Sequence, residues 1–269
     1  MSERDRVFAG SIPALYDRYL GPLLFEPYAN DIARRLSDLT EGRLLETAAG
    51  TGIVTRALAS RALNHVQIVA TDLNQPMIDH AATHISSPRV TWQQADALNL
   101  PFGDASFDCV VCQFGIMFLP DKPKAYREAL RVLKPGGHFI FNVWDNIEEN
   151  QFAHLVAESV ESLFPDDPPM FLKRTPHGYH NRQAIRHELE KAGFSVAKCE
   201  TITFRSCASS PSHPAIGYCQ GTPLRGEIEA RGASRLQEAT DAATEAIAAQ
   251  FGTGAIDGKI QAHVFSAFR

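Results

Sequence analysis

The 269-residue sequence has no hydrophobic run that approaches the roughly 18 apolar residues of a membrane-spanning helix. Its first residues, Met-Ser-Glu-Arg-Asp-Arg, lack the apolar core of a signal peptide. It also has no run of lysine and arginine, and its formal net charge of −5 argues against a nucleic acid as partner. We therefore expect a cytoplasmic protein with no membrane span and no nucleic-acid partner.

The sequence has only five cysteines. An odd number in a chain expected to be cytoplasmic argues against a framework of disulfides. Cys109 and Cys112 form a C-x-x-C pattern, which in principle suggests redox chemistry or a metal site. They lie on a predicted strand, however, where residues three apart point to opposite faces. We expect buried, inert thiols here and no metal.

The sequence shows no internal repeat and no low-complexity tract, and we expect a single domain. Residues 11–40 precede the first predicted strand and favour helices. Gly21-Pro22 is expected to break the first helix, and Asp31 to Leu39 is expected to form a second one.

A predicted buried strand ends at Glu46, and a loop of small residues then leads into a helical pattern. Gly50 and Gly52 allow positive φ and leave space beside the backbone for a ligand. The loop departs from the dinucleotide fingerprint G-x-G-x-x-G, because Thr55 occupies the position of the third glycine. Taken alone, this segment is also compatible with a plain tight turn.

Acidic residues follow at informative distances. A second predicted strand over residues 66–71 ends in Asp72, where a carboxylate in an α/β unit can bind both ribose hydroxyls. A third short strand leads to Asp96, a fourth covers residues 106–114, and a fifth begins at His138. Strands that alternate with helices in this way are typical of a parallel, doubly wound sheet.

This series resembles the class I S-adenosylmethionine-dependent methyltransferases, and within them the small-molecule branch related to the ubiquinone/menaquinone-biosynthesis C-methyltransferases. The resemblance is close over residues 44–143 and loose elsewhere, and it departs from the family at Ala48, where the first glycine of the motif usually lies. It implies an α/β, Rossmann-like, seven-stranded, mostly parallel sheet with helices on both faces and an antiparallel last strand. Extra N-terminal helices and a helical insertion after the fifth strand are also expected.

The resemblance further implies S-adenosyl-L-methionine as methyl donor and divides the chain into four parts. These are an N-terminal helical lid (1–40), a cofactor-binding core (41–144), an insertion that covers the substrate (145–192), and C-terminal strands and helices (193–269). Asp72 would bind the ribose, Leu73 would pack on the adenine, and Asp96 with Ala97 would meet the adenine amino edge. The full set of expected donor-binding residues is Glu46, Ala48, Gly50, Thr51, Gly52, Asp72, Leu73, Met77, Asp96, Ala97, Gln113, Tyr16 and Tyr19.

The acceptor is expected over the carboxyl ends of the strands, beneath a mobile apolar loop (Pro165 to Gly178) that exposes Met170 and Phe171. A general base is needed only if the acceptor must lose a proton. His177 and His180 are the candidates, although capping and surface hydrogen bonding explain them better. The expected acceptor-binding residues are Phe114, Met117, Trp144, Phe171 and Tyr179.

The leading hypothesis is therefore an S-adenosylmethionine-dependent methyltransferase for a small, partly apolar or aromatic molecule. One alternative is a protein that binds the same ligand without turnover. Another is a nicotinamide-dependent oxidoreductase, against which Thr55 and the acidic Glu46 both count. The sequence leaves open the acceptor, its attacking atom and the oligomeric state.

Overall fold

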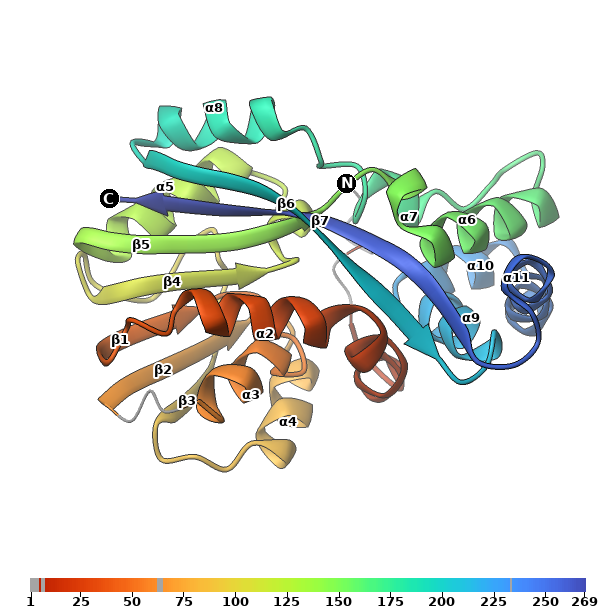
Figure 1. The fold of residues 1–269 in the computed structure, drawn as a ribbon, viewed down its shortest axis with the longest axis horizontal. Helices are drawn as coiled ribbons and strands as arrows, with labels where there is room; N and C mark the ends of the chain where they lie inside the picture. Colours follow the sequence, from red (N-terminus) through yellow and green to blue (C-terminus); the bar gives the residue numbers. More distant parts are fainter. Residues whose placement is uncertain (1–4, 6–7, 62–64, 233) are drawn as a thin grey trace.

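A single seven-stranded sheet forms the centre of the molecule, with strand order β3-β2-β1-β4-β5-β7-β6 (Figure 1). The structure is a computed structural model that describes residue 5 and residues 8–61, 65–232 and 234–269. β7 runs antiparallel to both of its neighbours, and the remaining pairs are parallel. This arrangement confirms the predicted fold class. The strands are β1 (Glu41–Glu46), β2 (His65–Asp72), β3 (Val90–Gln94), β4 (Phe107–Gln113), β5 (Leu133–Trp144), β6 (Ser195–Ala208) and β7 (Ile256–Phe268).

The central strands are apolar because both faces of the sheet are covered. Leu45 of β1 is fully buried and pairs with Val69 of β2 on one side and Val110 of β4 on the other. Because these three strands are parallel, their carboxyl ends meet at one edge of the sheet. That edge carries Glu46 and Asp72, together with Gln113 at the end of β4.

Helices cover the two faces of the sheet (Figure 1). On one face α2 (Glu26–Arg35) packs on α3 (Ile53–Ala59), with α4 (Gln75–His84) against β2 and β3. On the other face α5 (Lys122–Val132) packs on α8 (Arg182–Ala192). Asn181 caps α8, because its Oδ1 accepts hydrogen bonds from the backbone N–H groups of Gln183 and Ala184.

The N-terminal helices differ from the expectation, because Gly21-Pro22 does not break them. After α1 (Ile12–Leu15) the chain continues as a π-helix, η2 (Tyr16–Phe25), and then directly as α2. The wider π turn, in which the Glu26 N–H reaches the Gly21 carbonyl, accommodates the proline that would clash in an α-helix. The second helix thus begins at Glu26 and ends at Arg35, several residues earlier than predicted.

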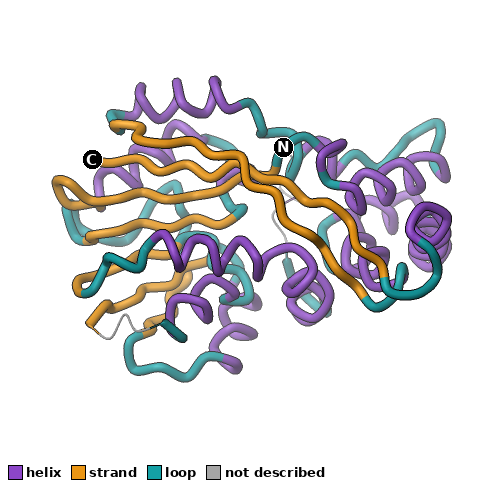
Figure 2. The backbone as a smooth tube through the Cα atoms, in the orientation of Figure 1, coloured by secondary structure: helices purple, strands orange, loops and turns teal. Residues whose placement is uncertain are grey.

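A second group of helices lies beyond the carboxyl edge of the sheet, around the far end of the long β6–β7 hairpin (Figure 2). The predicted insertion after β5 is present as α6 and α7, and three further helices lie between β6 and β7. The first of these three, at residues 212–220, was not predicted from the sequence. The group consists of α6 (Gln151–Leu163), α7 (Phe171–Arg174), α9 (Ser212–Gln220), α10 (Leu224–Arg231) and α11 (Arg235–Phe251).

The predicted apolar loop after α6 contains a short helix, α7, and is less exposed than expected. Met170 is 38% exposed, as predicted, but Phe171 is only 1% exposed because it begins α7 and points into the protein. None of the helices in the described part of the chain has the length and hydropathy needed to cross a bilayer.

Candidate functional site

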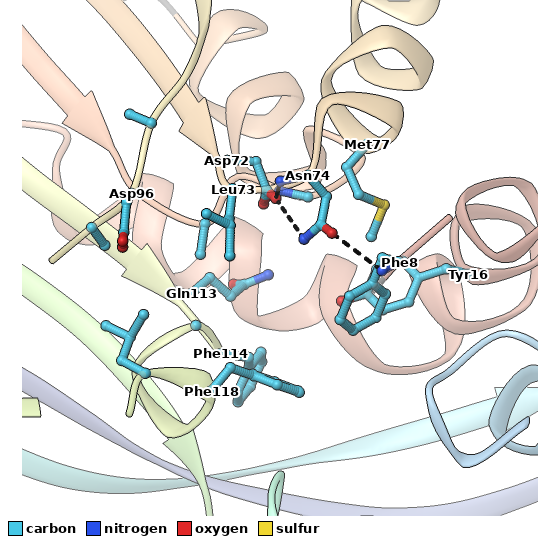
Figure 3. Close-up of a pocket in the computed structure, with 16 residues that line it drawn as sticks. Phe8, Tyr16, Asp72, Leu73, Asn74, Met77, Asp96, Gln113, Phe114 and Phe118 are labelled. Atoms are coloured by element: carbon cyan, nitrogen blue, oxygen red, sulfur yellow. Dashed lines mark hydrogen bonds between the residues drawn. The ribbon is translucent and has the colours of Figure 1, made fainter. Parts of the chain in front are cut away.

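A cavity opens at the carboxyl ends of β1, β2 and β4, where the sequence placed the ligand (Figure 3). It encloses about 680 Å³, counting its open mouth, which is in the usual range for a small-ligand site. Most of the residues predicted to bind the donor line it, namely Tyr16, Ala48, Gly50, Asp72, Leu73, Met77, Asp96, Ala97 and Gln113.

The two glycines of the loop after β1 have different surroundings. Gly50 has φ +55°, and a Cβ added there would find only the Met77 Cε atom, at 3.9 Å. Gly52 has φ +78° and is packed tightly, because an added Cβ would lie 2.8 Å from both Ile85 and Trp92. Gly50 therefore leaves open space towards the cavity, whereas Gly52 allows α3 to start close to its neighbours.

Asp72 holds the shape of this loop. Its Oδ2 accepts a hydrogen bond from the Gly50 N–H (2.9 Å), and its Oδ1 accepts one from the Asn74 N–H (2.8 Å). Oδ1 also accepts a longer hydrogen bond from the Asn74 side-chain Nδ2 (3.3 Å). A carboxylate has about four lone-pair sites, so these three bonds leave acceptor capacity for about one further hydroxyl. Burial raises the pKa of Asp72, although the hydrogen bonds from Asn74 and Gly50 oppose the rise.

Two further groups suit a ligand with an apolar ring and a polar tail. The Leu73 side chain is 39% exposed beside the cavity, which is unusual for a large apolar group in this protein. Gln113 donates from Nε2 to the Phe25 carbonyl (3.2 Å). Its Oε1 is buried and has no hydrogen-bond partner among the described residues. A buried acceptor of this kind is costly unless a ligand donates to it.

N-terminal residues cover the cavity, and the sequence revealed only part of this cover. The backbone N–H of Phe8 donates to Asn74 Oδ1 (3.3 Å), and the Phe8 ring packs edge-on against Tyr16 at 5.9 Å between centroids. Neither Phe8 nor Asn74 was predicted. Asn74 carried a usable signal, since it stands just before Gln75-Pro76 at the start of α4. Other lining residues that were not predicted are Ala95, Gly115 and Leu119.

Asp17 of η2 fastens this cover to the glycine loop. Its Oδ1 accepts hydrogen bonds from Thr51 Oγ1 and from Arg56, each at 2.9 Å, and its Oδ2 lies 3.4 Å from His80 Nε2. Burial raises the pKa of Asp17, but the bonds from Arg56 and Thr51 outweigh that effect and leave it below the ordinary value. A ring nitrogen of His84 lies within 4.8 Å of a carboxylate oxygen of Asp17 and a ring nitrogen of His80.

Four residues predicted to bind the donor do not line the cavity. Glu46 is buried and accepts a hydrogen bond from Thr55 Oγ1 (2.5 Å), and burial raises its pKa to about 8. The Thr51 hydroxyl donates a hydrogen bond to Asp17, and Gly52 packs against α4 and β3. Tyr19 packs against His213 of α9 at 5.4 Å between ring centroids, away from the opening. Of the two lid tyrosines, only Tyr16 lies over the cavity.

A second cavity, of about 520 Å³ counting its open mouth, adjoins the first. Four aromatic residues line both cavities: Phe8, Tyr16, Phe114 and Phe118. Phe114 has φ +50° and receives support from Asn142, whose Oδ1 accepts the Phe114 N–H at 2.9 Å. Its ring stacks flat on Trp144, with 3.7 Å between centroids and 5° between planes.

Trp144, Phe171 and His177 line the second cavity, as the sequence suggested for an acceptor site. The other acceptor candidates lie elsewhere. Met117 is 1% exposed within the core, and the Tyr179 hydroxyl bonds to Tyr126 (3.0 Å) and to Glu188. His180 lines a separate surface groove next to Arg182.

Cys109 and Cys112 are both buried in β4, and burial raises the pKa of each thiol, that of Cys112 to about 11. Such thiols are poor nucleophiles, in line with the inert role expected for them.

Comparisons with known proteins agree with this geometry. A family model described as a methyltransferase domain matches residues 45–141. The UbiE ubiquinone/menaquinone-biosynthesis C-methyltransferase of Pseudomonas aeruginosa is 39% identical over 182 residues, covering 62% of this chain and 71% of that protein. The demethylmenaquinone methyltransferase of Clavibacter sepedonicus is 37% identical over 180 residues, covering 63% and 72%.

Solved structures support the fold. Phosphoethanolamine N-methyltransferase 2 of Haemonchus contortus, in a complex with S-adenosylhomocysteine, superposes with a TM-score of 0.62 at 19% identity and covers 100% of this chain and 61% of its own. The YcgJ protein of Bacillus subtilis gives a TM-score of 0.58 at 19% identity, covering 90% and 98%. These findings do not favour the two alternative functions. The chain belongs to the class I S-adenosylmethionine-dependent methyltransferases, in the branch related to the ubiquinone/menaquinone-biosynthesis C-methyltransferases, and S-adenosyl-L-methionine is its methyl donor.

Proposed function

We propose that this methyltransferase transfers a methyl group to a ring carbon of a small reduced quinone. The donor would occupy the first cavity, with its ribose on Asp72 and its adenine against Leu73. The acceptor would occupy the second cavity. The observation that carries this proposal is the shared aromatic wall, which places an apolar, aromatic compartment directly beside the compartment that suits the donor.

The donor compartment fits S-adenosylmethionine at several points. Gly50 leaves room for a ligand against the backbone, and Asp72 has acceptor capacity for a ribose hydroxyl. Gln113 Oε1 offers a buried acceptor on the side expected to hold the methionine end. When bound, the donor supplies a sulfonium methyl that an aligned nucleophile can attack. The protein's task is to hold the two reactants close together in a site that excludes water.

The acceptor compartment fits a flat aromatic ring. Phe25, Phe114, Trp144 and Phe171 contribute to its walls, and few polar groups interrupt them. Aromatic side chains bind a ring by stacking and edge-on contacts. Curated relatives that match the chain act, by their names, on ubiquinone and menaquinone precursors, which contain such a ring.

The direct test is to supply 1,4-naphthohydroquinone, kept reduced, together with donor carrying a ¹³C-labelled methyl group. We expect a product whose labelled methyl is bonded to a ring carbon, as read by NMR and mass spectrometry. A labelled methyl found only on oxygen, or no transfer to this and related hydroquinones, would contradict the proposed function.

The donor half can be tested separately with Asp72→Asn. We expect it to weaken binding of S-adenosylhomocysteine by roughly 1.5–3 kcal/mol, because the charge-assisted bonds to the ribose are lost. The exposed Asp166→Asn is the matched control and should bind as the wild type does. Calorimetry measures both, and unchanged affinity in Asp72→Asn would remove Asp72 from the donor site.

A further inference from the structure

His177 occupies a distinctive position in the second cavity. It is 5% exposed, lines the cavity, and packs near Trp144 with 6.1 Å between ring centroids. Its Nδ1 lies 2.8 Å from the backbone carbonyl oxygen of Asp145. Because a carbonyl oxygen only accepts hydrogen bonds, Nδ1 must carry the proton. In the neutral ring the lone pair is then on Nε2, which has no hydrogen-bond partner among the described residues.

The other polar groups that line this cavity cannot serve as a base. Burial raises the pKa of both Tyr16 and Tyr218, so each keeps its proton. Asn150 is held through both side-chain atoms by backbone groups, including the carbonyl and N–H of Gln261. Thr222 donates its hydroxyl hydrogen to the Tyr218 carbonyl (2.6 Å). Among the lining residues that the structure describes, only His177 offers a nitrogen lone pair.

Burial keeps the His177 ring neutral before the reaction. Burial and, to a smaller extent, His180 lower its pKa, while the Asp145 carbonyl and the charges of Asp145 and Glu148 raise it, and the net pKa is about 4. The Asp145 carboxylate also faces His263 of β7, whose Nε2 lies 3.1 Å from Oδ1. A neutral imidazole is compatible with a cationic donor in the adjoining cavity.

We propose that His177 is the general base of the reaction, with Nε2 accepting the hydroxyl proton of the acceptor. The inference rests on the proposed function and narrows it, because it requires an acceptor with an ionisable hydroxyl on its ring. The ring's electron pair forms the new carbon–carbon bond as the carbon–sulfur bond breaks, and that bond's pair stays on sulfur. The hydroxyl oxygen becomes a carbonyl as its proton moves to Nε2. The ring regains aromaticity when its C–H proton moves to that carbonyl oxygen.

This proton transfer keeps the net charge of the site constant. One positive charge is present on the donor's sulfur before transfer, and one is present on the His177 ring afterwards. The repulsion that would oppose an imidazolium beside a sulfonium therefore ends as the sulfur becomes neutral. The nearby carboxylates of Asp145 and Glu148 then stabilise the protonated ring.

The kinetic test uses His177→Gln, with the exposed His187→Gln of α8 as matched control. We expect kcat for 1,4-naphthohydroquinone to fall by roughly 10²–10⁴-fold in His177→Gln, the usual contribution of a general base. Binding of S-adenosylhomocysteine should change by less than about twofold, because His177 does not line the donor cavity. The control should keep both properties.

A second readout does not depend on turnover or on a variant that folds. In ¹⁵N-labelled wild-type protein with S-adenosylhomocysteine bound, 1,4-naphthohydroquinone should shift the Nε2 resonance of His177, and 1,4-dimethoxynaphthalene should not. Wild-type protein that fails to methylate any hydroquinone would overturn the proposed function. Full activity in His177→Gln, or an Nε2 resonance that the hydroquinone leaves unchanged, would overturn only the inference about His177.

Discussion

The residues after β1 and β4 show how closely the backbone is packed at the donor cavity. Ala48 has φ +53°, in the left-handed region that favours glycine, and it stands where the family usually has glycine. A Cβ added to Gly115 would lie 2.5 Å from the Ala48 Cβ and 2.7 Å from the Cys112 Sγ. The methyl group of Ala48 therefore takes up space that a larger residue at position 115 would need.

We predict that Gly115→Ala lowers the free energy of unfolding by about 1–3 kcal/mol because of this overlap. In the Ala48→Gly background the same change should cost at least about 0.5 kcal/mol less, since one of the two clashes is gone. Urea denaturation of the four proteins measures the coupling. Gly226→Ala, where an added Cβ meets nothing within 4 Å, is the control. Strictly additive effects at positions 48 and 115 would contradict this account.

The identity of many cavity residues could be predicted from the sequence, but the direction of their side chains could not. Asp72 and Gln113 end strands, and strand order alone brings them to the same edge. Glu46 also ends a strand, yet it turns to Thr55 of α3 instead of the cavity. Tyr179 likewise finds partners in Tyr126 and Glu188. Such choices depend on hydrogen-bond partners that only the folded chain brings together.

At the scale of elements, the N-terminal cover is a continuous helical segment that changes from π to α geometry at Glu26. Gly21-Pro22 is a reliable breaker of α-helices, but the wider π turn removes the clash on which that rule depends. The same segment packs closely on α9, where a Cβ at Gly217 would lie 2.5 Å from the Leu20 side chain. The helix α9 has little amphipathic periodicity, which explains why the sequence gave no clear sign of it.

We predict that Asp17→Asn loosens this cover without unfolding the protein. Its carboxylate joins η2 to Thr51 and Arg56, but the pair is partly exposed, so its contribution is modest. S-adenosylhomocysteine should dissociate about two- to tenfold faster, because the cover opens more often. Stopped-flow fluorescence measures the rate, with Asp166→Asn as control. An unchanged dissociation rate would show that Asp17 does not hold the cover closed.

At the scale of the whole molecule, the alternating strands and helices were sufficient to predict a parallel sheet, whereas its antiparallel last strand was predicted from the family resemblance. The second cavity could not be predicted in the same way. Its wall draws on distant segments, from Phe8 and Leu24 to Phe114, Phe171 and Tyr218. No local sequence pattern predicts that these segments come into contact, because the contact depends on how the helices beyond the sheet pack against the N-terminal cover.

Burial of His177 also couples the second cavity to the stability of the whole protein. The pKa of His177 is lowered from 6.5 to about 4 in the folded protein, chiefly by burial. Between these values the unfolded chain binds a proton that the folded protein does not. Stability must therefore fall as the pH is lowered from about 6.5 to 4, by up to about 3 kcal/mol from this one group.

We accordingly predict that His177→Gln loses less stability than the wild type over this pH range. The effects of His138 and His263, whose pKa values burial also lowers, are present in both proteins and cancel in the comparison. Urea denaturation at several pH values gives the slope of unfolding free energy against pH for each protein. His187→Gln should retain the wild-type slope. Equal slopes for the wild type and His177→Gln would mean that His177 ionises freely in the folded protein. The cavity around it would then be open to water, which a site for an apolar ring should exclude.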